Sequence, residues 1–394
     1  MYGGVITMAI PLGKTADLRF SADGKFRIMQ VADTQDTQVT SKDTLAFLEK
    51  ALDEAKPDLV IFTGDQFKGY GVSFLLGDRE ENYKRAIDNL IAPVEARGIP
   101  FSFVFGNHDD QAFGIPKEKQ LEMYRAHKNC IAVAGDTALP GLCNQYINLR
   151  SADGEKILFN LYLIDSLSTT LDGKCASVSK EQIAWYRTVR DSLKEQTGAY
   201  VPSILFQHIP VPEMWEVLKE VPKSHKPHAE GFRAHAGKFY DIDERFLQKG
   251  NCDFLLETPA TPAENSGEFE AVSEMGDTLA MFFGHDHNNS FVSRYQNMLL
   301  GYTQGCGFHV YGPKLDRGVR LIDLNAENPR EFETHTLLYR DLFTVRDIKN
   351  KPKYLLYSYA PPSVESVLPK LKKVGIAAGV AAAGGLVYAL AKRK

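Results

Sequence analysis

The sequence predicts an α/β protein, a layered αββα sandwich of two mixed β-sheets flanked by helices. Between residues 26 and 324, short apolar runs alternate with stretches whose apolar residues recur at helical spacing. After residue 287 the pattern changes to short strand-like segments without helices between them. Continuous apolar strands separated by helices indicate a sheet buried on both faces, and we expect the later strands to form a second sheet packed against it.

The individual elements follow from this periodicity. Residues 26–33 are typical of a buried strand that ends at an acidic residue, and residues 41–55 of a helix with Ser41 as its N-cap. A helix containing Ala86, Ile87, Leu90 and Ile91 precedes a strand at 101–106, and another helix spans 180–193. The other expected strands lie at 58–65, 157–165, 203–208, 279–284, 291–295, 297–303, 318–324 and 332–339.

The domain organisation is dominated by one large unit. We expect an N-terminal extension at 1–23, the main domain at 24–340 and a proline-containing linker at 341–373. Within the main domain, residues 209–276 break the strand–helix rhythm and form a loop-rich insertion, of the kind that usually serves binding. Three histidines of this insertion are expected at the surface: His225, His228 and His235.

Composition excludes several classes of protein. The 394 residues are 44% apolar and 24% charged with a net charge of −4, which is typical of a globular protein. No Lys/Arg-rich stretch in the body of the chain indicates a nucleic-acid partner. The five cysteines are scattered, without CxxC pairs, and are expected to be idle thiols in a reducing compartment.

The C-terminal segment 374–391 carries no charge over 18 residues and has basic residues on both sides. That length just reaches across the hydrocarbon core of a bilayer. We therefore expect a single C-terminal transmembrane helix that anchors the protein in a membrane, with the catalytic domain on the cytoplasmic side. Because alanine and glycine dominate the segment, a detached tail is the alternative. The sequence leaves the oligomeric state open.

Polar clusters that carry the chemistry follow five of the predicted strands. The carboxyl ends of strands in an open α/β sheet form a common crevice, so side chains distant in sequence meet there. Aspartate, asparagine and histidine are ligands for divalent metals, and no cysteine occurs in any of the clusters. The clusters are VADTQ (31–35), FTGDQ (62–66), FGNHDD (105–110), FQH (206–208) and FGHDH (283–287).

The order D-x-Q, G-D, G-N-H-D, a strand-terminal H and G-H-x-H resembles the calcineurin-like metallophosphoesterase superfamily, and within it the purple-acid-phosphatase-like branch. The resemblance covers residues 24–340 and implies the metallophosphoesterase fold. It also implies two divalent ions (Mn, Fe or Zn), with Asp65 bridging them and Gln35 as a possible further ligand. The other implied ligands are Asp33, Asn107, His208, His285 and His287.

The implied reaction is hydrolysis of a phosphoric ester by a metal-bound hydroxide acting on a small phosphorylated substrate. His108 would assist the leaving group, and Asp109 would support it. Two positions depart from the family pattern: Gln35 replaces a histidine, and Lys68 replaces the tyrosine of purple acid phosphatases. The alternatives are a pyrophosphohydrolase acting on nucleotide- or lipid-linked diphosphates, and an inactive relative that only binds.

Overall fold

The computed structural model describes residues 18–170, 173–250 and 252–361. Its five-stranded mixed sheet has the order β16-β15-β2-β3-β4, in which β2, β3 and β4 are parallel and β15 is antiparallel to both β2 and β16. The strands are β2 (Lys25–Val31), β3 (Leu59–Thr63), β4 (Phe101–Val104), β15 (Gly318–Asn325) and β16 (Phe332–Leu338).

An eight-stranded mixed sheet has the order β1-β5-β6-β7-β12-β14-β13-β11. Its central strands β6, β7, β12 and β14 are parallel to one another. The strands are β1 (Leu18–Arg19), β5 (Gln145–Arg150), β6 (Ile157–Leu163), β7 (Ser203–Phe206), β11 (Phe254–Leu255), β12 (Thr278–Phe283), β13 (Asn289–Tyr295) and β14 (Met298–Tyr302).

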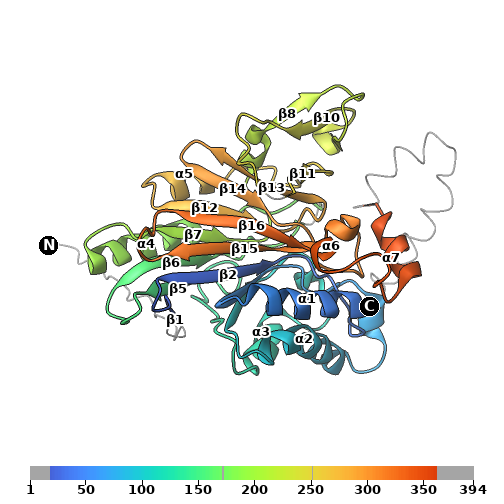
Figure 1. The fold of residues 1–394 in the computed structure, drawn as a ribbon, viewed down its shortest axis with the longest axis horizontal. Helices are drawn as coiled ribbons and strands as arrows, with labels where there is room; N and C mark the ends of the chain where they lie inside the picture. Colours follow the sequence, from blue (N-terminus) through green and yellow to red (C-terminus); the bar gives the residue numbers. More distant parts are fainter. Residues whose placement is uncertain (1–17, 171–172, 251, 362–394) are drawn as a thin grey trace.

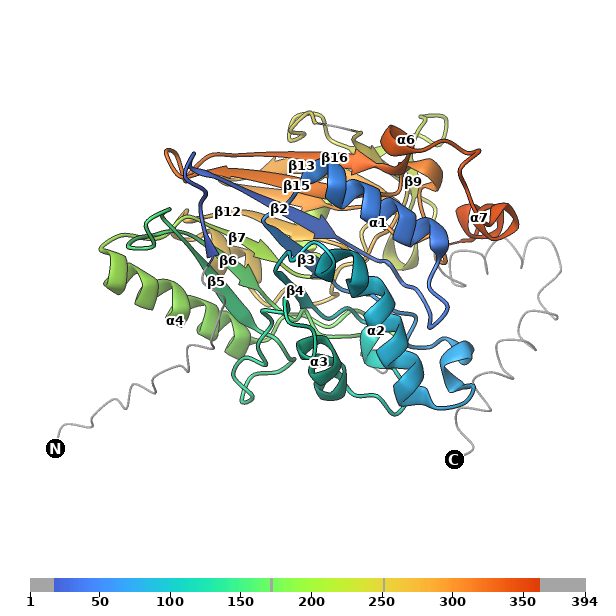
Figure 2. The ribbon, with the colours of Figure 1, turned by 60° about the horizontal axis from the view of Figure 1, so that its bottom comes forward.

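Helices cover the outer faces of the two sheets (Figures 1 and 2). The first three helices pack on the five-stranded sheet, whereas α4 and α5 pack on the eight-stranded sheet. This arrangement confirms the predicted αββα sandwich. The helices are α1 (Lys42–Ala55), α2 (Arg79–Glu95), α3 (Lys117–Arg125), α4 (Lys180–Thr197), α5 (Glu268–Ser273), α6 (Tyr339–Leu342) and α7 (Lys351–Ser358).

The core between the sheets follows from the two-residue period of the strands. On β3, Leu59 and Ile61 point into the layer between the sheets, whereas Val60 and Phe62 contact the helices outside. Phe206 on β7 meets the same inter-sheet layer from the other sheet. Because both faces of the central strands are buried in this way, most of their residues are apolar.

The start of α1 follows from its capping residue. The side chain of Ser41 accepts hydrogen bonds from the backbone N–H groups of Asp43 and Thr44, which would otherwise lack partners in the first turn. Leu48 and Leu52 are buried on the face of the helix that meets the sheet. The predicted helix and its N-cap are therefore confirmed.

The division of strands between the sheets differs from the prediction. We expected every strand after residue 287 to belong to a second sheet, but β13 and β14 extend the sheet of β7 and β12. Only β15 and β16 join the sheet of β2, since the chain returns after β14 to pair β15 beside β2. Apolar periodicity identifies a strand but does not identify the neighbour with which it forms hydrogen bonds.

The insertion at 209–276 contains regular structure. A three-stranded sheet comprises β8 (Leu218–Val221), β9 (Ala229–Glu230) and β10 (Phe239–Ile242), and Figure 1 shows it projecting beyond β11 and β13. Short 3-10 helices η3 (Pro212–Val217) and η4 (Arg233–His235) flank its strands. The described part of the expected linker, 341–361, includes α7.

The membrane prediction requires correction. Within the described part of the chain, no helix has both the length and the apolar character needed to span a bilayer. This finding contradicts the transmembrane helix and the membrane-anchored, cytoplasm-facing location inferred from it, and neither is retained. The segment 374–391 itself lies outside the described residues. The inference relied on the absence of charge, whereas the alanine and glycine of this segment bury little apolar area.

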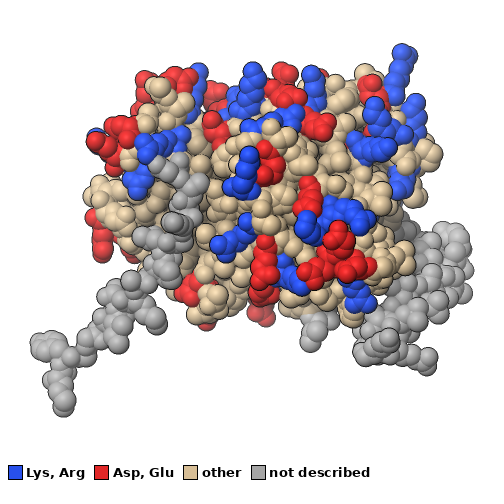
Figure 3. Space-filling view, turned by 90° about the horizontal axis from the view of Figure 1, so that it is seen from below, with Lys and Arg blue, Asp and Glu red and all other residues tan. Residues whose placement is uncertain are grey.

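Acidic and basic side chains are mixed on one face of the molecule. On the face shown in Figure 3, basic and acidic side chains of the described residues are interspersed over the whole surface. This face therefore has no extended area of a single charge sign.

Candidate metal centre

The polar clusters predicted from the sequence meet at one edge of the sandwich. Asp33 and Asp65 follow β2 and β3 of the five-stranded sheet, whereas His208 and His285 follow β7 and β12 of the eight-stranded sheet. Since the two strands of each pair are parallel neighbours in their sheet, their carboxyl ends converge from the two layers.

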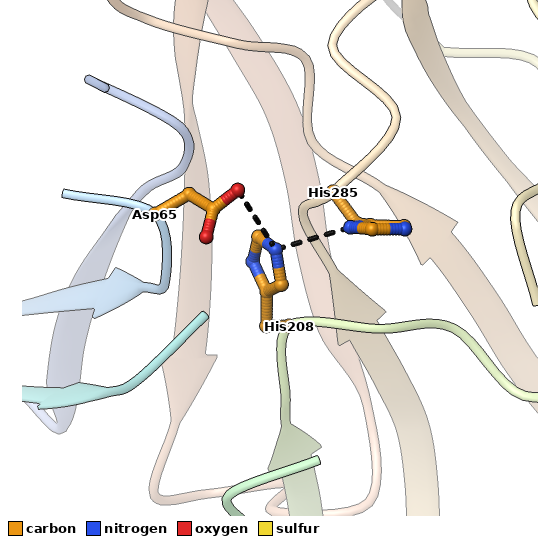
Figure 4. A group of neighbouring side chains, drawn as sticks. All are labelled: Asp65, His208 and His285. Atoms are coloured by element: carbon orange, nitrogen blue, oxygen red, sulfur yellow. Dashed lines mark hydrogen bonds and ion pairs between the residues drawn. The ribbon is translucent and has the colours of Figure 1, made fainter. Parts of the chain in front are cut away.

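Two overlapping groups of side chains at this edge have the arrangement of metal ligands. One consists of Asp65, His208 and His285 (Figure 4), and the other of Asp33, Asp65 and His287. Within each group the ligand atoms lie within 4.8 Å of one another. Asp65 belongs to both groups, so its carboxylate lies between two possible cation positions.

The first group is centred on Nε2 of His208. This atom lies 3.3 Å from Oδ2 of Asp65, 3.1 Å from Oδ1 of Asn107 and 3.2 Å from Nδ1 of His285. In the second group, Nε2 of His287 lies 3.3 Å from Oδ1 of Asp33. Besides Gln35, the structure therefore brings together the six residues for which the resemblance implied a ligand role.

Backbone carbonyls orient the two histidines that are most deeply buried. Nδ1 of His208 lies 2.8 Å from the carbonyl oxygen of Thr63, and Nδ1 of His287 lies 2.9 Å from that of Tyr311. A carbonyl oxygen can only accept, so Nδ1 donates in each ring and Nε2 is directed toward the carboxylates. Such an outer hydrogen bond fixes the ring orientation of metal-binding histidines.

The turns that carry the ligands have a backbone conformation that side chains rarely adopt. Asp33, Gln35, Asp65 and His285 have φ values of 53°, 34°, 52° and 74°, all in the left-handed region. Each carboxylate also accepts from the backbone of another cluster: the N–H of His285 donates to Asp33, and that of His108 donates to Asp65. The strained turns are therefore held in place by one another.

Glycines within the clusters provide the space for these contacts. A Cβ atom on Gly64 would lie 2.5 Å from the His208 ring, and one on Gly284 would lie 2.7 Å from Oδ2 of Asp33. A Cβ atom on Gly106 would overlap the Asp65 carboxylate. Each glycine of one sequence cluster thus makes room for a ligand side chain from another cluster.

Electrostatics links the buried acids to the histidines. Burial alone would lower the pKa of His208, but the carboxylates of Asp65 and Asp33 outweigh burial and raise it to about 10. Burial would raise the pKa of Asp65, but His208 and His108 hold it below its usual range. Metal binding displaces protons from the ligands, so a cation could replace the extra proton on His208 and compensate the negative charge of the same carboxylates.

The residues present fit a pair of divalent cations. Oδ1 of Asp33 is buried and accepts no hydrogen bond of good geometry from any described residue, although Nε2 of His287 lies 3.3 Å away. Leaving a buried carboxylate oxygen without a partner is costly unless a cation compensates it. The donor set combines carboxylate, amide and imidazole groups without a thiolate in either group, which suits Mn, Fe or Zn.

Two predicted residues lie close to the centre but make other contacts. Nε2 of Gln35 donates to Oδ2 of Asp65 at 2.8 Å, so its amide nitrogen rather than its oxygen faces the centre. Asp109 is buried and accepts from the backbone N–H groups of Phe67 and Gly106. Asp109 therefore holds the loop that presents Asn107 and His108, and burial raises its pKa to about 7.

His108 is partly accessible, with 28% of its side chain exposed. Its Nε2 lies 3.8 Å from Oδ2 of Asp65, and its Nδ1 lies 2.8 Å from Oε1 of Gln111. The ring thus stands beside the shared carboxylate at the entrance of the centre, where a substrate would approach.

A cavity of about 320 Å³ opens over this centre and contains residues that the sequence did not indicate. Tyr311 stacks on His287 with ring centroids 4.1 Å apart. Sγ of Cys175, expected to be idle, lies 3.6 Å from Nε2 of His285. The three histidines of the insertion do not line this cavity. The lining residues that sequence reasoning missed include Cys175, Phe232, Arg233, Glu257, Thr258 and Tyr311.

Comparison with known proteins identifies the family. The calcineurin-like phosphoesterase family model matches residues 26–289, and the chain belongs to this family. Two similar proteins of Arabidopsis thaliana are named "Probable inactive purple acid phosphatase 14" and "Probable inactive purple acid phosphatase 29". The first is 27% identical over 79% of this chain and 78% of its own length, and the second is 26% identical over 80% and 82%. The predicted superfamily and branch are confirmed.

A similar solved structure is a dimetal phosphatase from Danio rerio. It is 14% identical, with a TM-score of 0.48, and the match covers 80% of this chain and 99% of that protein.

We predict that Gly106→Ala disrupts the centre, because the added Cβ would overlap the shared carboxylate. Metal content after reconstitution with Mn, measured by inductively coupled plasma mass spectrometry, should fall well below that of the unchanged protein. Gly250→Ala is the control, since its Cβ would meet nothing closer than 3.7 Å. Full metal content in Gly106→Ala would contradict the close approach of this glycine to Asp65.

We also predict that Gln35→Glu lowers the stability of the metal-free protein, because a second carboxylate would replace a donor beside Asp65. Adding Mn should restore the melting temperature, since a cation compensates the added charge. Gln38→Glu, on the same loop but bonded to Ser73, is the matched control. Equal melting temperatures for the metal-free Gln35 variant and the unchanged protein would show that Gln35 does not contact Asp65.

Proposed function

We propose that the protein hydrolyses phosphoric esters of small molecules at a dinuclear metal centre. The observation that carries this proposal is that Asp65 belongs to both groups of candidate ligands. Membership of the calcineurin-like phosphoesterase family supports it. When bound, two divalent ions would supply the Lewis acidity that activates water and the phosphoryl group.

In this proposal, each ion has its own set of ligands besides Asp65. Asp33 and His287 would hold one ion, and Asn107, His208 and His285 would hold the other. The carbonyl oxygens of Thr63 and Tyr311 would keep Nε2 of the two buried histidines directed at the ions. Gln35 would hold the shared carboxylate in place rather than ligate, given its hydrogen bond to Asp65.

His108 would serve as the group that assists departure of the alcohol. It is the accessible imidazole beside the shared carboxylate, and Gln111 orients it through Nδ1. Because Nδ1 donates to Gln111, Nε2 faces the centre, and the ring in its imidazolium form would donate a hydrogen bond or a proton from Nε2 to the leaving oxygen. Asp109 would act through the loop, without touching the substrate.

A second candidate function is an inactive relative that binds without hydrolysis. The names of the Arabidopsis thaliana relatives and the presence of Gln35 favour it. The geometry favours the enzyme, because six ligands from five separate clusters converge although binding alone would not require all of them.

The first prediction of this proposal concerns Asp65→Asn. With Mn, Fe(II) or Zn, the unchanged protein should bind two ions per chain and hydrolyse 4-nitrophenyl phosphate or its diester. Asp65→Asn should lose metal and turnover together, because one carboxylate serves both positions. Asp110→Asn, exposed and outside both groups, is the control. Two bound ions without hydrolysis of any ester would identify an inactive relative, and turnover in the Asp65 variant would refute a shared ligand.

The second prediction concerns the leaving group. His108→Ala should lower kcat for alkyl phosphates by about 10²-fold or more while metal content is unchanged. The loss should be smaller for 4-nitrophenyl phosphate, since nitrophenolate departs without a proton. His225→Ala, which removes an imidazole paired with Asp241 on the insertion, should have no effect. An equal loss for both leaving groups would exclude proton donation and indicate an electrostatic role.

A further inference from the structure

The cavity over the metal centre has a second wall that belongs to the insertion. The segment between β9 and β10 contributes Phe232 and Arg233, and the segment after β11 contributes Thr258. These residues line the same cavity as Asp65, His108 and His285. A molecule held at the metal centre would therefore extend between the candidate ligands and the insertion.

Thr258 offers a polar group to this space. Its side chain is 2% exposed, and Oγ1 has no hydrogen-bond partner among the described residues. Buried hydroxyls almost always have a partner, so one without a partner at a cavity wall indicates a position for a ligand atom. A hydroxyl can donate to an anionic oxygen as well as accept.

Arg233 supplies the charge at the same wall. It begins η4 with a φ of 52°, a conformation that non-glycine residues rarely adopt and that recurs at binding sites. Nη2 donates to the carbonyl oxygen of Gly173 at 2.8 Å, and the guanidinium lies over the Phe232 ring at 5.5 Å. The planar guanidinium carries five N–H donors in a geometry that matches phosphate and carboxylate oxygens.

Two of the acids that line the cavity, Glu257 and Asp286, accept hydrogen bonds from donors of the protein, and Glu230 of β9 lies at the same wall as Arg233. Oε1 of Glu257 accepts from the backbone N–H of Asn288 at 2.7 Å. Oδ2 of Asp286 accepts from the hydroxyl of Tyr302 and from the backbone N–H of Ala260. Both carboxylates are thus engaged by donors of the protein. The cavity volume of about 320 Å³ is at the lower end of the range for small-molecule sites, which suits a compact ligand.

We propose that Arg233 and Thr258 bind a second anionic group of the substrate, so that the preferred substrates are phosphate esters carrying a second anion, with organic diphosphates as the shortest members. This inference rests on the proposed function, since the metal centre holds the phosphoryl group that reacts. According to this proposal, residues of the insertion determine which phosphate esters bind.

The test measures binding, so it does not depend on turnover. Isothermal titration of the Mn-loaded protein compares methylenediphosphonate, which carries two anionic groups, with methylphosphonate, which carries one. The unchanged protein should prefer methylenediphosphonate. Arg233→Met should reduce that preference by about tenfold or more, because the charge-assisted, bidentate hydrogen bonds of the guanidinium are lost. Thr258→Val, of the same shape, should reduce it by a smaller factor.

The control is Arg245→Met, which removes another arginine of the insertion, one that pairs with Asp243 and does not line the cavity. It should retain the full preference. Equal affinity of the unchanged protein for both probes, or an undiminished preference in Arg233→Met, would overturn the inference. Failure of the proposed function is a separate result, because it would be seen as absent hydrolysis in a metal-loaded protein whatever its preference between the two phosphonates.

Discussion

The buried carboxylate of Asp65 is the constraint on which the rest of the site depends. It is almost inaccessible to water, yet four neighbouring groups approach it: Nε2 of His208, Nε2 of His108, the amide of Gln35 and the backbone N–H of His108. Such a charge requires compensation of opposite sign, which a proton on His208 provides in the absence of metal. In the proposed function, cations on both sides of Asp65 would take the place of that proton.

The sandwich makes this arrangement possible because it holds strand ends from two layers against one another. Apolar packing on both faces fixes the strands, and their carboxyl ends then carry turns with unfavourable φ values. The turns are stabilised by each other through backbone donors to Asp33 and Asp65, and by glycines that admit the opposing side chains. Stability and ligand geometry therefore depend on the same contacts.

Much of this was predictable because the ligand clusters and strands are local in sequence. The polar clusters and the strand before each could be predicted from residue type and period, whereas the six ligand roles and the sharing of Asp65 were implied by the resemblance to the metallophosphoesterase superfamily. The sheet to which β13 and β14 belong could not be predicted, because the spacing of apolar residues does not show which strands form hydrogen bonds with each other. The rotation of the Gln35 amide, the contact of Cys175 with His285 and the wall formed by Arg233 depend on tertiary contacts between distant segments. The membrane prediction is contradicted because no helix of the described residues could span a bilayer, and segment 374–391 lies outside those residues.

The central claim is that one carboxylate lies between two cations. Crystals grown with Mn and measured by anomalous diffraction test it directly, because each bound ion gives its own peak. The account predicts two peaks about 3.5–4 Å apart, one beside His208 and His285 and the other beside Asp33 and His287, with Asp65 between them. A single peak, or peaks away from Asp65, would contradict it.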